Sequence, residues 1–85
     1  MPEISRFYGI VIEMRRNEHG RPHFHAKCGR DTIAVTIEDG IAIGDFPARK
    51  LTLVTRWLNL HRQELLQNWH LARAHQPPRY IDPLD

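Results

Sequence analysis

The sequence predicts a single α+β domain, in which a four-stranded antiparallel sheet is followed by helix packed on one of its faces. Two observations carry this prediction: apolar residues alternate with period two in the first half of the chain and recur with a period near 3.6 in the second. We therefore divide residues 1–85 into a sheet (1–46), a helical region (47–75) and an extended tail (76–85). Connections of hairpin length between the strands make the sheet antiparallel.

The four strands are expected at residues 7–15, 23–28, 32–37 and 41–43, separated by segments rich in Gly, Pro, Asn and Asp. The side of the first strand that faces the helix is expected to carry Tyr8, Ile10, Ile12 and Met14. The apolar side of the second strand carries Phe24, Ala26 and Cys28. The alternating residues of the second strand therefore share the opposite side of the sheet: His23, His25 and Lys27. Apart from the tail, no segment remains to cover that side.

The helical region begins at Pro47, which suits a first helical turn, and contains no further Gly or Pro up to His75. One stripe of the helical wheel is expected to cover the sheet: Leu51, Val54, Leu58, His61, Leu65, Trp69 and Ala72. A second and nearly opposite stripe also contains large apolar residues: Leu53, Trp57, Leu60 and Leu71. The basic residues are expected to form a solvated face, with Arg49, Arg56 and Arg73.

The length of the helical region requires an explanation. A straight helix over residues 47–75 would be about 43 Å long, whereas a compact domain of this size is roughly 30 Å across. Either the helix bends near residues 59–62, or a second copy of the chain buries the excess in a homodimer through Trp57 and Leu60. We favour the bend, because Asn59 can cap a new helical segment. The tail is expected to dock on an apolar surface through Tyr80, Ile81 and Leu84.

The histidine-bearing side of the second strand is the candidate site. If the first two strands form a hairpin, alternation of the side chains leaves three registers open. In one register Glu13 faces His25, and in the other two it faces His23 or Lys27. In the first two registers a carboxylate and an imidazole lie side by side, with Cβ atoms about 5 Å apart.

Three interpretations of this cluster remain open. The first is a divalent-metal site, in which His23 and His25 are joined by a third ligand such as His19 or Glu13. The second is acid–base chemistry on RNA, with an imidazole oriented by Glu13 and a phosphate held by Arg15. The third is a binding surface of ordinary solvent-facing side chains, composed of His23, His25, Lys27 and the tail residue Tyr80.

The composition limits the class of protein. The chain is 41% apolar and 26% charged, which is typical of a globular domain. Its one cysteine excludes an internal disulfide framework, and no apolar run approaches the ~20 residues that cross a bilayer. Residues 1–6 lack the apolar core of a signal peptide, so we expect a cytoplasmic protein without a membrane partner. The twelve basic residues are interleaved with ten acidic ones, which gives only weak support for a nucleic-acid partner.

Four segments have a distinctive sequence: MPEISRFYGIVI at residues 1–12, PHFHA at 22–26, LLQNW at 65–69 and IDPL at 81–84. In these segments the chain resembles the bacterial domain-of-unknown-function family 4160. The resemblance implies a small single-domain protein, often encoded beside another small protein in an arrangement like a toxin–antitoxin pair, and it implies no reaction. We therefore expect a protein-interaction module with no resident cofactor. The alternative is a histidine-based ribonuclease or metal-dependent nuclease that uses Glu13, His19, His23 and His25.

Overall fold

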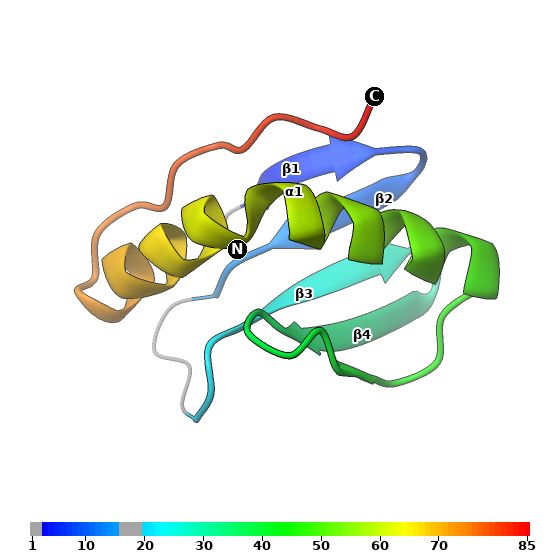
Figure 1. Ribbon diagram of the computed structural model, residues 1–85, viewed down its shortest axis with the longest axis horizontal. Coiled ribbons are helices and arrows are strands. Elements are labelled where there is room, and N and C mark those ends of the chain that lie inside the picture. Colours follow the sequence, from blue (N-terminus) through cyan, green and yellow to red (C-terminus); the bar gives the residue numbers. More distant parts are fainter. Residues whose placement is uncertain (1–2, 16–19) are drawn as a thin grey trace.

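A computed structural model of the chain describes residues 3–15 and 20–85. A five-stranded antiparallel sheet is followed by one long helix (Figure 1). The strands pair in chain order: β1 (Glu3–Phe7), β2 (Ile10–Glu13), β3 (His23–Cys28), β4 (Asp31–Thr36) and β5 (Ala42–Ile43). The helix, α1 (Ala48–Arg73), crosses one face of the sheet, and the tail returns along the helix to β1. The α+β class is confirmed.

The number of strands differs from the prediction, because residues 3–7, which lie mostly before the first expected strand (7–15), form β1 and pair with β2 in a hairpin. Tyr8 and Gly9 form its two-residue turn with φ values of 50° and 78°, and Phe7 pairs with Ile10 on either side. Two positive φ values match the twist of a tight hairpin, and Gly9 supplies one of them without strain. Tyr8 therefore lies at an exposed turn and not on the helix-facing side of a strand.

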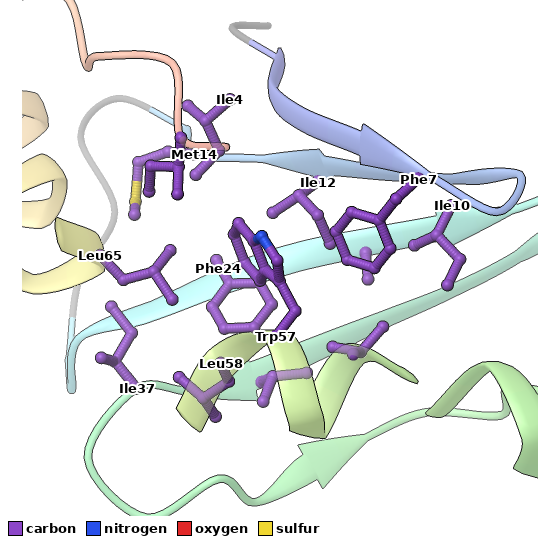
Figure 2. Close-up of a cluster of buried hydrophobic side chains, with 14 of the residues drawn as sticks. Ile4, Phe7, Ile10, Ile12, Met14, Phe24, Ile37, Trp57, Leu58 and Leu65 are labelled. Carbon is purple, nitrogen blue, oxygen red and sulfur yellow. The ribbon is translucent and has the colours of Figure 1, made fainter. Parts of the chain in front are cut away.

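The core lies between α1 and the sheet (Figure 2). Trp57 is fully buried at its centre, where its ring is tilted against Phe7 at 5.4 Å and meets the edge of Phe24 at 5.8 Å. The expectation that Trp57 lies on an outer stripe and forms a dimer surface is wrong for this residue. Leu60 of that stripe is 66% exposed, so dimerisation around it remains a prediction.

α1 is bent, and the bend lies where the length of the helical region predicted it. His61 has non-helical backbone angles (φ −124°, ψ 24°), which divides the helix within the predicted range 59–62. Arg62 fixes the bend, because its Nε donates to Ile37 O at 2.8 Å and its Nη2 to Asn59 Oδ1 at 3.1 Å. Asn59 therefore accepts from a guanidinium, whereas we predicted a helix cap. Trp57 precedes the bend and lies beside Val54 and Leu58, both buried, so it faces the core together with them.

The C-terminal tail docks on the chain's own core through Ile81 and Leu84, whereas Tyr80, which we expected to dock with them, is 60% exposed. Ile81 is buried, and its N–H donates to Ile4 O on the outer edge of β1 at 2.7 Å. The carboxamide of Asn68 donates to Arg79 O and accepts from Arg79 N–H, both at 2.8 Å. Trp57 Nε1 donates to Asp82 O at 2.8 Å. The tail thereby joins the first strand to both halves of the bent helix.

Among the described residues, no helix has the apolar length that a membrane crossing requires.

Candidate functional site

The candidate site lies on the face of the sheet opposite α1, which we call the open face. Its central row runs from β5 to β1 through Ile43, Ala34, His25, Glu13 and Glu3. A second row crosses β4 to β1 through Thr32, Lys27, Val11 and Arg6. Glu13 therefore faces His25 and Val11 faces Lys27, which is one of the three registers left open by the sequence. Phe24 and Ala26 are fully buried under α1 and Lys27 is exposed, so the predicted division of β3 into two sides is confirmed for these residues, whereas His23 also contacts the helix.

The two histidines of β3 are close together. Their ring centroids are 5.2 Å apart at an interplanar angle of 74°, which is an edge-to-face arrangement. The His23 Nδ1 donates a hydrogen bond to Arg21 O at 2.8 Å. Both imidazoles are half-buried and both make contacts within the structure.

One histidine also touches the helix, which the sequence did not predict. The His23 ring lies 5.1 Å from the ring of Trp69, whose other neighbour is the Arg73 guanidinium at 6.0 Å from the ring centroid. His23 is the first residue of β3 and so lies at the margin of the sheet. The imidazole thus joins the last turns of α1 to the open face.

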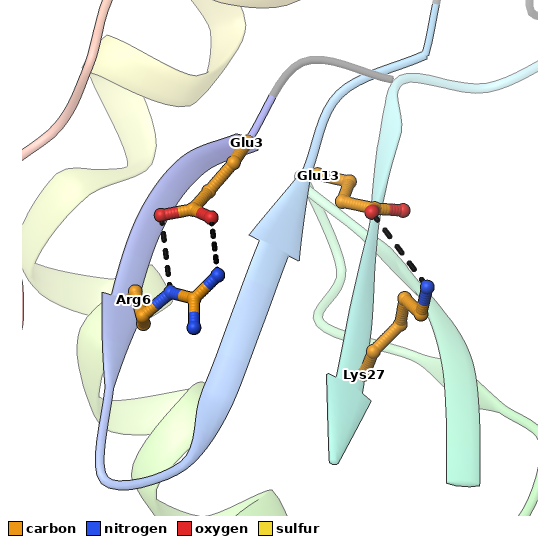
Figure 3. A network of polar contacts seen from close by, with 4 residues as sticks. All are labelled: Glu3, Arg6, Glu13 and Lys27. Carbon is orange, nitrogen blue, oxygen red and sulfur yellow. Dashed lines mark hydrogen bonds and ion pairs between the residues drawn. The ribbon is translucent and has the colours of Figure 1, made fainter. Parts of the chain in front are cut away.

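Glu13 is the most buried ionisable group of the open face among the described residues. The residue is 8% exposed, and its Oε2 lies 3.9 Å from Lys27 Nζ, an ion pair longer than a hydrogen bond (Figure 3). Within the described residues its Oε1 is buried and accepts no hydrogen bond. A buried carboxylate oxygen of this kind is unfavourable unless a ligand or a neighbouring donor reaches it.

A second acid on the open face is paired more closely. Arg6 donates to both carboxylate oxygens of Glu3, at 2.7 and 3.3 Å, as Figure 3 also shows. The hydrogen bonds from Arg6 lower the pKa of Glu3, and the pKa of Arg6 is raised by the same contact. Since both acids of the central row have cationic partners, the face presents balanced ion pairs.

The remaining predicted site residues lie at different distances from this cluster. Arg15, the residue expected to hold a phosphate, is half-buried and lies beyond the end of β2 at Glu13. Tyr80 is 60% exposed on the tail. His19, the proposed third metal ligand, lies outside the described residues. In the described part of the chain, no three His, Cys, Asp or Glu side chains converge as a cation site would need.

Sequence reasoning missed an apolar strip along the β5 margin of the open face. Ile43 faces Ala34 and is 67% exposed, and Ile41, whose carbonyl accepts from Thr36 N–H at 2.9 Å, is 51% exposed. The pairing of β4 with β5 could have revealed it, since a hairpin puts residues 41 and 43 on the same side as residues 36 and 34. The open face therefore combines an apolar strip with a strip of imidazoles and ion pairs.

The comparisons with known proteins concern the family alone. The sequence model of the family described as "Domain of unknown function (DUF4160)" matches residues 9–70. That span includes β2–β5 and most of α1, and hence the histidine pair and Glu13. No curated protein and no solved structure is significantly similar to the chain.

Proposed function

We propose that the chain, which belongs to the domain-of-unknown-function family DUF4160, is a cytoplasmic protein-interaction module that binds a small partner protein through its open face. A toxin–antitoxin-like pair is the setting in which we place it. The observation that carries the proposal is the apolar strip of Ile41 and Ile43 beside the imidazoles and ion pairs. Protein interfaces combine an apolar core with polar groups that set orientation in this way.

The exposed isoleucines provide the affinity in this proposal. Two large aliphatic side chains on one sheet face are more than half exposed, although neither is required by the chain's own core. Full burial of one such side chain by a partner would contribute about 1.5–3 kcal/mol. The neighbouring ionic groups would contribute mainly to orientation and to the rejection of other partners.

The tail has a smaller part in binding than the sequence suggested. Ile81 and Leu84 are buried against the chain's own helix and β1, so they are not available to a partner. Tyr80 is the large tail side chain that stays exposed. We therefore place the partner mainly on the open face, with Tyr80 as a peripheral contact.

The experiment measures binding of the purified chain to the product of the neighbouring gene, where the resemblance implies a small partner protein, by titration calorimetry. Ile43→Ser should weaken binding by about 10- to 100-fold, because it removes one apolar contact. His25→Ala should weaken it as well. The matched control is Leu60→Ser, which removes an equally exposed aliphatic side chain from the helix and should leave affinity unchanged. Unchanged affinity in both Ile43→Ser and His25→Ala would rule out the open face.

A histidine-based ribonuclease is the second candidate, and one observation favours it. A buried carboxylate faces His25 across the sheet, and a second imidazole lies 5.2 Å away, which are the components of acid–base catalysis. RNA cleavage by the purified chain should then be lost in His25→Ala and retained in Ile43→Ser. If the wild-type chain does not cleave RNA and Ile43→Ser weakens partner binding, the result favours the interaction module.

A further inference from the structure

Charge is distributed unequally between the two layers of the fold. Residues 46–85, which contain α1 and the tail, hold six of the twelve Lys and Arg and three of the ten Asp and Glu, a net charge of +3. Residues 1–45 hold the other six basic residues and seven acids, a net charge of −1. The total of +2 therefore comes from a basic layer of helix and tail on a nearly neutral sheet.

The basic layer divides into cations used by the fold and cations left at the surface. Lys50 donates to Tyr8 O, and Arg62 donates to Ile37 O. Glu64 is the one acid of α1, and its Oε1 lies 2.6 Å from His61 Nδ1. Within the described residues, the other four cations are exposed and form no ion pair: Arg49, Arg56, Arg73 and Arg79. Four arginines therefore lie on or beside the solvent side of the helix without neutralisation.

Most exposed side chains between these arginines are polar and uncharged, and they include Thr52, Asn59, Gln63 and Gln67. Leu60 and the acid Glu64 are exposed among them. Two shallow hollows adjoin α1. One, of about 580 Å³, is lined by Arg56, Thr52, Thr55 and Asn59 together with Ala48 and Leu51, and the other, of about 480 Å³, is lined by Arg79, His70, Gln67 and Gln76 together with Leu71 and Ala74. Guanidinium, hydroxyl and amide groups are the usual donors to phosphate oxygens.

The dimensions of this surface match a nucleic-acid duplex. Arg49 and Arg73 lie near the two ends of the bent α1, in a molecule whose longest dimension is 33 Å, which is close to the length of one duplex turn. A single strand is usually held by stacking its bases on aromatic rings. Both tryptophans of α1, Trp57 and Trp69, are buried, so the helix offers no such platform and favours a duplex.

We propose that the solvent face of α1 binds the phosphate backbone of a nucleic-acid duplex without reading its sequence, through Arg49, Arg56, Arg73 and Arg79. This surface is on the opposite side of the molecule from the open face, so the proposal does not depend on the partner protein. Four phosphate contacts give an affinity that falls with salt at a logarithmic slope of about −3.6. Removal of two contacts reduces the slope to about −1.8.

The test is fluorescence anisotropy of a labelled DNA duplex of about two helical turns, titrated with the full chain between about 50 and 200 mM salt. The double variant Arg49→Gln/Arg56→Gln should bind at least 10-fold more weakly at the lowest salt and lose about half of the salt slope. The matched control, Arg6→Gln/Lys27→Gln, makes the same change in net charge on the open face. It should bind as wild type does. All four substituted residues are exposed, and urea unfolding checks that each variant is folded.

Three outcomes would overturn the proposal. Equal losses in the two double variants would show attraction by net charge alone. Equal affinity for the separated single strand would contradict the preference for a duplex. If polyglutamate displaces the labelled duplex as effectively as unlabelled duplex of equal charge does, the surface binds an acidic protein instead.

Discussion

The substitution Asn68→Ala tests how the tail is held to the helix. Asn68 is 2% exposed, and its one carboxamide makes two hydrogen bonds with the backbone of Arg79, both at 2.8 Å. The pair resembles one rung of a β-ladder, provided by a side chain. Its loss removes the link between the second half of α1 and the tail, while the Trp57–Asp82 and Ile81–Ile4 hydrogen bonds remain.

The magnitude follows from the two bonds. Each contributes about 1 kcal/mol net, and a buried backbone group left without a partner adds to the loss. Arg79 is exposed, so its N–H and C=O regain water when the tail moves, which limits that addition. We expect the free energy of unfolding to fall by about 2–3 kcal/mol. In a chain of this size the melting temperature should fall by about 10 °C or more.

Urea unfolding followed by tryptophan fluorescence measures this change, and Trp57 Nε1 bonded to Asp82 O makes the signal sensitive to the tail. Gln67→Ala is the matched control, since it removes an exposed amide from the adjacent helical position and should change stability by less than about 0.5 kcal/mol. If Asn68→Ala is as stable as Gln67→Ala, the carboxamide does not hold the tail and the reasoning fails.

Three further substitutions test local backbone and charge. His75→Gly should raise the free energy of unfolding by about 0.5–1 kcal/mol in thermal unfolding, because His75 follows the end of α1 with φ +59°, where a side chain is strained. A loss of stability in this variant would contradict the left-handed conformation of His75. Gly9→Ala should lower the free energy of unfolding by about 1 kcal/mol through backbone strain at φ +78°, since the added Cβ meets only Lys50 Nζ at 3.8 Å. Unchanged stability would mean that Gly9 does not have a positive φ. By NMR titration, Arg6→Gln should raise the pKa of the Glu3 carboxyl toward its ordinary value. Because folding lowers that pKa, the contribution of Glu3 to folding stability is present above about pH 4.5 and is lost as the pH falls through the lowered pKa. An unchanged Glu3 titration in Arg6→Gln would contradict the ion pair between Arg6 and Glu3.

The candidate site was predictable as far as its residues depend on local alternation. The bounds of β3 and the division of its side chains between two faces follow from period two, which is a property of any strand. The sequence left three registers of β2 with β3 open, and one of them places Glu13 opposite His25. The choice among the three depends on the geometry of the connection between the two strands. The burial of Glu13 and the contact of His23 with Trp69 depend on segments that are distant in the chain. Local sequence patterns therefore could not predict either feature.

The helical region shows the same division. The sequence alone determined that a helix of this length must bend or find a second subunit, because apolar side chains on two sides cannot all face one sheet. Only the tertiary structure decided that His61 is the bend, that Arg62 secures it on Ile37 O and that Trp57, beside Leu58, lies in the core. The physical reason is range: helix and strand periods are set within a few residues, whereas the direction in which a helix turns is set by hydrogen bonds and packing across 25 residues of sequence.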